Sequence, residues 1–461
     1  MPPRSFNKSR ARLRWVRLAE AARLRGAVML VALAPGPAVV EANGVLRDGA
    51  GARSMASGGA GAALTGDPLA ALYANPAGLA APNGGWFQLG AVAASAQGEF
   101  SNAANPGRPL RSEWGALPEA ALALPLKGTP VTLGLAVMPE ALASVDWRFT
   151  DAPGGLGGAT SYGVQRHHAE IIAIRTALGA SVRLCDAVTF GGSLGVEYNR
   201  NTLVAPYTFQ SHPVLRGFKT LLDLETDGWG VNGSIGIVWH PCEQIHVGLS
   251  YRSMTHLETD GDADGNASVQ LQNIGAGAFQ PDFHYDAEVI TKLPQIVSAG
   301  ISWQARERWR LLGQVDWINW SDSFDELDIR LSNGNNADLN GFLGTDAIRD
   351  VAPLDWKDRF VIRGGVEFAA TAEFTLRAGY AYGGNPVPDS TVTPMSAAIL
   401  EHTVTAGVGW QRGQWAIGAA YQYSFPSETN VGTSGLESGE YSNSRAEVQA
   451  HWLGLTLSIG F

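Results

Sequence analysis

Apolar and polar residues alternate along short segments of this chain from about residue 85 to its end. The C-terminal segment HWLGLTLSIGF is the clearest case, because every second position is apolar: Leu453, Leu455, Leu457, Ile459 and Phe461. The positions between them are mostly small or polar. Successive side chains of a β-strand point to opposite faces, so this pattern predicts strands with one face toward lipid and the other toward a lumen.

About fourteen such segments follow one another, an even number as in bacterial single-chain barrels. We expect strands to begin near Trp86, Glu113, Val131, His168, Val188, Gly230, Ile245, Glu288, Trp309, Phe360, Phe374, His402, Trp415 and Arg445. Short connections at 127–130, 184–187, 240–243, 304–308, 369–373 and 411–413 alternate with long ones at about 98–112, 139–166, 199–228, 256–287, 321–357, 383–401 and 425–444. Short periplasmic turns and long outer loops are typical of an all-β, transmembrane antiparallel β-barrel.

The segment from Trp309 to Trp317 has the length that a membrane strand needs. Leu311 and Val315 share one face with these two tryptophans. Eight residues that rise ~3.4 Å each and tilt by about 40° climb roughly 20 Å, close to the ~25 Å apolar band that aromatic girdles flank. A strand of a soluble sandwich is the alternative, and the tryptophan at each end favours the membrane strand.

Composition supports the barrel. Charged residues make up 16% of the chain, against about 25% in soluble proteins, whereas glycine (56 residues) and tryptophan (14 residues) are abundant. The sequence has no run of about 18 apolar residues, the length that a membrane-spanning helix needs. The formal net charge of −10 argues against a nucleic-acid partner. Acidic residues gather in expected outer loops at 258–262 and 322–328, where a solvated surface is the default and weak binding of divalent cations the alternative.

Residues 1–42 have the features of a secretion signal. A basic region precedes an apolar stretch at 27–40, and small residues allow cleavage after Ala42. A basic arm for nucleic acid is the alternative, but such an arm would have no use for the apolar stretch. We therefore expect a signal peptide at 1–42, an N-terminal hatch at 43–83 and the barrel at 84–461.

The hatch is expected from the segment 57–79, SGGAGAALTGDPLAALYANPAGL, which is rich in glycine and alanine and nearly uncharged. By itself this segment could be a flexible linker. Because it stands directly before a barrel, its small side chains predict a plug that fills the lumen and can shift there. Asn75, Pro76, Ala77 and Gly78 would fix its exit toward the first strand.

Two long connections contain apolar residues that a solvated loop does not need. Leu215, Phe218, Leu221 and Leu222 recur at helical spacing in the connection 199–228. The next connection adds Val269, Leu271, Ile274, Phe279 and Phe283. Exposed apolar surface beyond the membrane usually marks a ligand or partner site. Packing of the loops on one another over the barrel mouth is the alternative, and both interpretations stay open.

No catalytic or metal-binding constellation stands out. The histidines lack carboxylate or cysteine partners at metal-ligand spacing, and the sequence has no GxSxG or HExxH motif. We therefore expect no enzyme, no cofactor and no metal site.

Cys185 and Cys242 fall in two short turns. Two cysteines in a secreted protein suggest a disulfide. The turns are two strand spacings, ~9.6 Å, apart, which exceeds the ~7 Å limit for a bridge. A disulfide therefore requires the turns to lean together, and free thiols are the alternative.

A set of short motifs along the chain is similar to a known protein family. The chain resembles the FadL family of outer-membrane transporters for long-chain fatty acids and other hydrophobic compounds over residues 43 to 461. The motifs, in order, are Asn75-Pro76-Ala77-Gly78-Leu79, Gly248-Leu249-Ser250-Tyr251-Arg252-Ser253, Leu293-Pro294-Gln295 leading to Gly300, Trp317-Ile318-Asn319-Trp320-Ser321, Trp356-Lys357-Asp358 running to Gly364-Gly365-Val366, and Arg377-Ala378-Gly379-Tyr380 followed by Asn385-Pro386-Val387-Pro388. Each motif is weak alone, whereas the ordered set is specific, and a general porin lacks the N-terminal segment.

The resemblance implies a barrel of about fourteen strands closed by an N-terminal hatch. It also implies a groove among the outer loops that collects hydrophobic ligand, a role that falls on Leu215, Phe218, Leu221 and Leu222, and an inner pocket that no motif identifies. Release is implied to go sideways, through a gap in the wall beside a kinked third strand. Pro139 either breaks the pairing of that strand or lies at its end.

We therefore expect a channel in the outer membrane of a Gram-negative bacterium for passive uptake of long-chain fatty acids or other hydrophobic compounds, aromatic hydrocarbons included. Inward Arg310 and Arg377 could hold a ligand carboxylate or could be lumen salt-bridge partners. The expected partners are the ligand, membrane lipid and lipopolysaccharide, and the barrel assembly machinery through the strand that ends at Phe461. We expect a monomer. A plugged barrel for polar solutes, or one for surface adhesion, is the alternative function.

Overall fold

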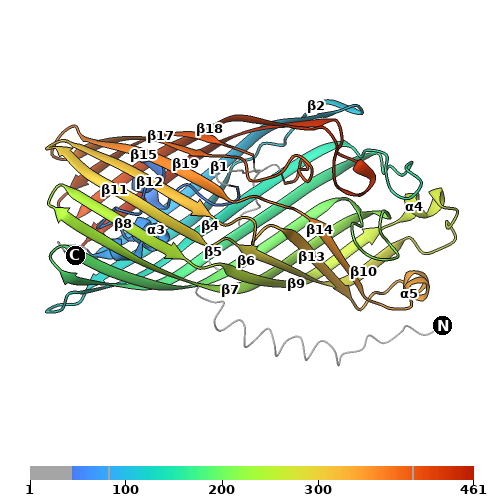
Figure 1. Ribbon diagram of the computed structural model, residues 1–461, viewed down its shortest axis with the longest axis horizontal. Coiled ribbons are helices and arrows are strands. Elements are labelled where there is room, and N and C mark those ends of the chain that lie inside the picture. Colours follow the sequence, from blue (N-terminus) through green and yellow to red (C-terminus); the bar gives the residue numbers. More distant parts are fainter. Residues whose placement is uncertain (1–43, 81–83, 397–398) are drawn as a thin grey trace, which may run out of the picture. The chain divides into compact units, whose positions relative to one another are not determined.

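The computed structural model describes residues 44–80, 84–396 and 399–461, and the expected leader lies outside them. The described residues form one antiparallel sheet that closes on itself where β1 pairs with β19 (Figure 1). Its strands are β1 (Trp86–Asn102), β2 (Asn105–Pro109), β3 (Gly115–Pro125), β4 (Val131–Thr150), β5 (Val164–Cys185), β6 (Val188–Thr208), β7 (Lys219–Cys242), β8 (Ile245–Arg252), β9 (Thr255–Asn266), β10 (Asp282–Leu293), β11 (Ile296–Arg306), β12 (Trp309–Ile318), β13 (Glu326–Ser332), β14 (Ile348–Pro353), β15 (Arg359–Ala369), β16 (Phe374–Gly383), β17 (His402–Arg412), β18 (Trp415–Val431) and β19 (Ser444–Gly460).

The chain runs from one end of the barrel to the other fourteen times, as the sequence predicted, and each such run is called a crossing. Some crossings consist of two strands in line, because both members pair with the same neighbouring crossing. β7, for example, pairs with β8 at one end and with β9 at the other. The same holds for β10 with β11, β12 with β13, and β14 with β15. β2 forms a short hairpin on the end of β1.

Long and short connections gather at opposite ends of the barrel, as expected. Figure 1 shows the outer-loop helices α4 (Ser268–Asn273) and α5 (Ala337–Leu343) at one end and the C-terminus at the other. A further short helix, η2 (Glu437–Gly439), lies in the connection between β18 and β19. In the described part of the chain, no helix is long and apolar enough to span a membrane.

Several strands are longer than the sequence predicted. β4 continues to Thr150, β6 continues to Thr208 and β7 begins at Lys219, so much of the expected connections 139–166 and 199–228 is strand. The reason is that the apolar pattern ends with the lipid band, whereas the backbone ladder continues beyond it. In β9 the outward side chains are acidic although the inward ones remain small or apolar.

The predicted lipid-facing rows are confirmed. Leu453, Leu455 and Leu457 of β19 are exposed on the outer wall, and the residues between them point inward. Trp309 and Leu311 are likewise exposed on β12. Side chains that would be buried in a soluble protein are thus displayed in the pattern that lipid contact requires.

The N-terminal segment lies inside the barrel as a plug. It contains α2 (Gly51–Ala56), α3 (Pro68–Ala74) and η1 (Pro76–Leu79), and nearly all of its residues are buried. Leu69, Leu72 and Leu79 pack against small wall residues such as Ala121 and Ala177. Asp67 caps α3 by accepting a hydrogen bond from its first turn. Because the plug side chains are small, its backbone approaches the wall closely.

Candidate functional site

A cavity of about 250 Å³ lies between the plug and the outer loops, and we call it the upper cavity. Strands β4, β5, β6 and β10 line it together with the segments before β15 and before β17. Most of the side chains that reach it are apolar: Val45, Ala143, Val145, Ile171, Leu203, Ala205, Leu224, Val289, Phe324, Leu354, Trp356 and Met395. A concave, mostly apolar site of this kind suits a small hydrophobic molecule.

β4, which forms the third crossing, contains a bulge. Its pairing with β5 shifts between Pro139 and Ala141, so Glu140 is the extra residue. On the other side, within the described residues, β4 pairs with β3 only as far as Val137, although β3 itself continues along β1. Pro139 therefore lies inside the strand, not at its end, and its lack of an N–H suits a place where the ladder stops. We call residues 138–145 of β4 the wall gap.

The beginning of the plug occupies the wall gap as a short extra strand. Leu46 pairs with Ala141 in antiparallel orientation. The backbone N–H of Arg47 donates to the carbonyl of Glu140 at 3.2 Å, and on the other side of the pair the N–H of Leu142 donates to the carbonyl of Val45 at 3.1 Å. The edge of β4 that β3 leaves open is thus covered by plug backbone. The cover can leave this edge only if the plug moves.

Buried ion pairs hold both borders of the wall gap. The guanidinium of Arg47 donates to Glu119 of β3 and to a carbonyl of β4, each at 3.1 Å. Glu140 forms ion pairs with Arg175 of β5, at 3.8 Å, and with Arg252 of β8. Buried charges are tolerated only when they are paired. Arg47 therefore ties the plug to both strands that border the gap.

Asn75 anchors the other side of the plug. Its side-chain oxygen accepts a hydrogen bond from the N–H of Ala77 at 3.1 Å and so caps η1. Its amide group donates to the carbonyl of Ala62 at 2.7 Å and to a carbonyl of β7 at 3.1 Å. Facing it is Gly236, where a Cβ would lie 2.1 Å from the Asn75 oxygen. Pro76 starts η1, where no N–H is needed.

A second cavity, of about 460 Å³, lies at the short-turn end of the lumen, and we call it the lower cavity. Glu367 accepts hydrogen bonds from Arg53 of the plug at 2.8 and 3.0 Å, from Arg377 at 2.8 Å and from Arg310 at 3.4 Å. Arg310 and Arg377 are therefore lumen salt-bridge partners in the lower cavity. The other charged residues of its lining are Asp67, Glu307, Arg308 and Glu373.

Comparison with known proteins identifies the family. Residues 37–461 match the family model described as outer membrane protein transport protein (OMPP1/FadL/TodX). The chain belongs to this family. Its fold is similar to that of a Pseudomonas aeruginosa FadL homologue, with a TM-score of 0.73 and 16% identity over 91% of this chain and 100% of that one. The toluene transporter TodX of P. putida gives a TM-score of 0.71 and 18% identity over 90% of this chain and 99% of that one.

Two further relatives are similar to this chain. The toluene transporter TbuX of Ralstonia pickettii has a TM-score of 0.67 and 17% identity over 90% of this chain and 99% of that one. A long-chain fatty acid transport protein of Escherichia coli O6:H1 is 24% identical over 169 residues. That match spans 36% of this chain and 35% of the relative's length. This chain is thus an outer-membrane barrel of the FadL family.

Of the four residues predicted to collect ligand, three are buried and Leu221 is half-buried. Leu215, Phe218 and Leu222 belong to a packed cluster with residues of β9, β10, β13 and β14. Neither these three nor Leu221 is among the described residues that line the upper cavity. The helical spacing inferred for Leu221 and Leu222 is wrong, because β7 begins at Lys219. The structure thus contains the loop packing that was the alternative, and the capture role stays a prediction.

A buried lysine joins three outer segments over the upper cavity. The ammonium group of Lys219 lies 2.6 Å from Asp151, in the connection after β4, and 2.8 Å from Glu440, in the connection after β18. It also donates to the carbonyl of Ala152 at 2.7 Å. Burial raises the pKa of both Asp151 and Glu440, and the nearby ammonium group opposes this rise. We call these three charged residues the lysine cluster.

The two cysteines are free and exposed in the structure. Cys185 ends β5 and Cys242 ends β7, so the whole width of β6 separates them. The turns do not lean together, and the bridge that the sequence left open is not formed. This outcome follows from the strand spacing, which exceeds the reach of a disulfide.

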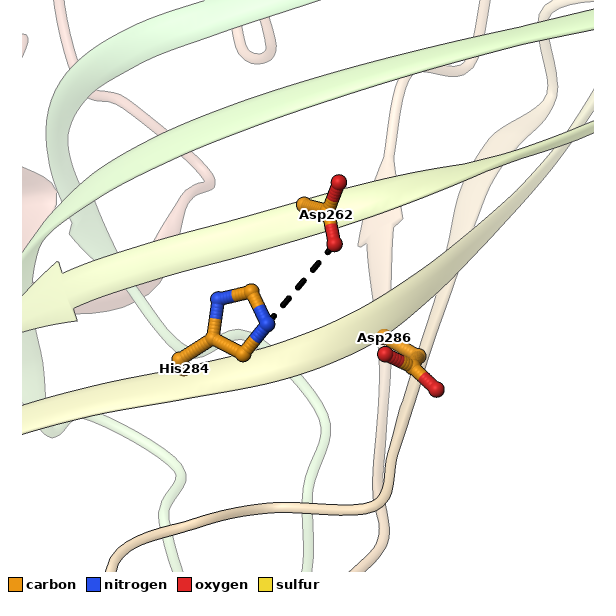
Figure 2. A group of neighbouring side chains, drawn as sticks. All are labelled: Asp262, His284 and Asp286. Atoms are coloured by element: carbon orange, nitrogen blue, oxygen red, sulfur yellow. Dashed lines mark ion pairs between the residues drawn. The ribbon is translucent and has the colours of Figure 1, made fainter. Parts of the chain in front are cut away.

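Figure 2 shows three side chains that converge on the outward face of β9 and β10. Asp262, His284 and Asp286 bring their polar atoms within 4.8 Å of one another. The Nε2 atom of His284 lies 3.7 Å from Asp262, and its Nδ1 atom lies 2.9 Å from Asp264. The acidic segment 258–262 is therefore strand and not the loop that was expected. The group faces away from the upper cavity, and exposed carboxylates of this kind are stable in water without an ion.

Sequence reasoning assigned no residue to the upper cavity, although Trp356 was named in a family motif. Most of its lining lies in segments that were expected to be loops, such as 139–166, 199–228 and 321–357, and about half of these lining residues belong to strands. A usable signal was present, because inward positions of β6 recur at every second residue up to Asn199, and the same count reaches Leu203, Ala205 and Tyr207. Following the alternation past the lipid band would have placed these side chains in the lumen.

Proposed function

We propose that this protein is a channel for passive uptake of hydrophobic compounds, fatty acids or aromatic hydrocarbons, with release sideways into the membrane. The observation that carries the proposal is the continuity of the upper cavity with the wall gap. Ala143 and Val145 of the gap and Val45 of its cover all line the cavity. Similar proteins include toluene transporters and a long-chain fatty acid transport protein, which supports the ligand class.

Capture begins on the outer loops. Leu156, Val214, Ile274 and Phe279 are exposed there, and exposed apolar side chains on loops beyond the membrane offer a hydrophobic molecule a first contact. Leu215, Phe218, Leu221 and Leu222 contribute when the packed cluster beneath these loops opens. The ligand then moves into the upper cavity, where it is surrounded by apolar side chains.

Release follows when the plug leaves the wall gap. The covering residues Leu46 and Arg47 separate from β4, and Asn75 keeps the remainder of the plug attached to the wall. The ligand passes between β3 and β4 beside Pro139 and enters lipid without crossing water. Its transfer into the apolar membrane interior supplies the driving force, so no energy-coupling site is required.

A reversible tether tests this route. In a chain with Cys185→Ser and Cys242→Ser, the pair Leu46→Cys and Ala141→Cys places two thiols on directly paired residues, where a disulfide can form. The host lacks its own transporter, and uptake of radiolabelled toluene and hexadecanoate is measured. We expect uptake to be lost in the oxidised variant and restored by reductant, because the plug cannot leave β4 while the disulfide holds it.

The matched control is Leu46→Cys alone in the same background, which should transport in both redox states. Equal uptake by the oxidised and reduced double variants would exclude release through the wall gap. Uptake of neither compound by the untethered protein would exclude the function itself. Purification of the protein in detergent and mass spectrometry of the molecules that accompany it provide an independent identification of the ligand class.

We also propose how the protein is targeted and what it contacts. Residues 1–42 act as a signal peptide that is removed after Ala42, residues 43–83 act as the hatch and residues 84–461 as the barrel. The strand that ends at Phe461 is recognised by the barrel assembly machinery. The assembled protein is a monomer in contact with membrane lipid and lipopolysaccharide, without enzymatic activity. N-terminal sequencing of the purified protein tests the cleavage site.

A further inference from the structure

The upper cavity has no positive charge to offer a ligand. Among the described residues that line it, none is a lysine, an arginine or a histidine. The charged residues of the lining are all glutamates: Glu170, Glu326, Glu437 and Glu440. A hydrophobic molecule that carries a carboxylate would therefore meet apolar side chains and other carboxylates.

The cations that border the outer end of the cavity are already bound. Lys219 is fully buried, and two carboxylates, those of Asp151 and Glu440, share its single ammonium group. Arg216 pairs with Glu437. Lys219 is thus not free to bind a third carboxylate, and a ligand anion placed beside the lysine cluster would meet two carboxylates opposed by one ammonium. The Arg216 side chain lies mostly in solvent and outside the cavity lining.

An anion and a neutral molecule differ sharply in what they need from such a site. Burying a carboxylate is strongly unfavourable unless a cation or several hydrogen-bond donors meet it. Burying an uncharged apolar molecule is favourable without any partner. The cavity volume of about 250 Å³ is large enough for this, since an engineered cavity of about 150 Å³ holds one benzene molecule.

Resting on the proposed function, we propose that the channel selects uncharged hydrophobic molecules of the size of a substituted benzene ring or a short alkyl chain. The lysine cluster and the apolar, cation-free lining of the upper cavity exclude the corresponding carboxylates. Asp151 and Glu440 thus determine specificity, because they occupy the buried ammonium group of Lys219, which a ligand carboxylate could otherwise use.

The test compares two ligands that differ only in the head group. Binding of radiolabelled 1-octanol and octanoate to the purified, full-length mature protein is measured in detergent at pH 8, and the signal of empty micelles is subtracted. We expect octanoate to bind about tenfold or more weakly than 1-octanol, because its desolvated carboxylate finds no cation. Toluene, which has no polar head group, should bind as well as 1-octanol does.

Two variants should reduce this preference. Met395→Lys brings an ammonium group into the cavity on an unbranched side chain of similar length, and Glu440→Gln releases Lys219 from one of its two carboxylates. Each should strengthen octanoate binding relative to 1-octanol. Met254→Lys makes the same substitution outside the cavity lining and should leave the ratio unchanged. If Met395→Lys fails to assemble, Glu440→Gln decides the question.

The outcomes separate the inference from the function on which it rests. Binding of octanoate as tight as that of 1-octanol by the unmodified protein would overturn the selectivity while leaving hydrophobic transport intact. An unchanged ratio in both Met395→Lys and Glu440→Gln would overturn the role of charge. Failure of toluene, 1-octanol and octanoate alike to bind would overturn the proposed function and the inference with it.

Discussion

The cavities on the two sides of the plug are lined by opposite kinds of side chain. Apolar residues of β4, β5 and β6 line the upper cavity, whose described lining contains no basic residue. In the lower cavity, Arg53, Arg310 and Arg377 surround Glu367. A hydrophobic molecule is stabilised in the first environment and gains nothing in the second, where it would displace water from charged groups.

The difference bears on the direction of transport. A straight path through the barrel would lead a hydrophobic ligand from apolar surroundings into a charged compartment and then into water. A sideways path through the wall gap leads from the upper cavity into lipid, and each step keeps the ligand in apolar surroundings. The charged lower cavity would thus oppose a straight path for this class of ligand, and the proposed sideways route avoids it.

The largest effect should come from a carboxylate placed in each cavity in turn. Val289→Asp puts an unpaired charge on the buried lining of the upper cavity, and Thr375→Asp puts one into the lower cavity, where arginines already lie. We expect toluene uptake at equal protein levels to fall about tenfold or more for Val289→Asp and to stay within about twofold for Thr375→Asp. Equal losses in both variants would mean that the ligand crosses the lower cavity.

A second test loosens the boundary between the cavities. Arg47→Met leaves Glu119 buried without its cation, and loss of one partner of a buried pair costs about 3–5 kcal/mol. The plug should therefore open more often, which amide hydrogen exchange over residues 44–80 measures. Adding Glu119→Leu should restore much of the protection, because no unpaired charge then remains. Unchanged exchange in Arg47→Met would show that the ion pair does not hold the plug.

The same two regions show how far sequence reasoning reaches. The outward rows were predictable, since Leu453 and Leu455 must face lipid and period two exposes them directly. The plug was predictable from its small residues and from its place before the first strand. The bulge at Glu140 was not, because an extra residue in a ladder is defined by register with β5, which the sequence of β4 alone does not contain.

The lining of the upper cavity was missed for a related reason. Beyond the lipid band, outward positions become polar, so the strand pattern weakens where the cavity begins. Lys219, Asp151 and Glu440 are far apart in the sequence, because Lys219 begins β7 whereas the two acidic residues belong to two different connections. These residues come into contact only when the barrel closes, so their spacing along the chain does not predict the contact. Arg310 and Arg377 could be named as inward cations, but only the fold places them below the plug.

A third test is confined to the lower cavity. Glu367→Gln keeps the shape of the side chain but removes the carboxylate that three arginines share. Repulsion among the arginines should loosen the contact between α2 and the wall and raise ion conductance through the barrel in planar bilayers. Toluene uptake should change by less than about twofold, because the sideways route does not use this compartment. A large fall in uptake with unchanged conductance would contradict the separation of the two regions.

The smallest effect concerns the cover of the upper cavity and depends on pH. Burial raises the pKa of Asp151 and Glu440 in the folded protein. Their protonation therefore favours the folded loops at acid pH, and this stabilisation is lost as the pH rises through the raised values. We expect hydrogen-exchange protection of residues 209–218 and 432–443, corrected for the intrinsic exchange rate, to be higher at pH 5 than at pH 7.5. Glu440→Gln should weaken this dependence, because one of the two titrating carboxyls is gone. Protection that rises toward neutral pH would show that Lys219 outweighs burial and lowers both pKa values instead.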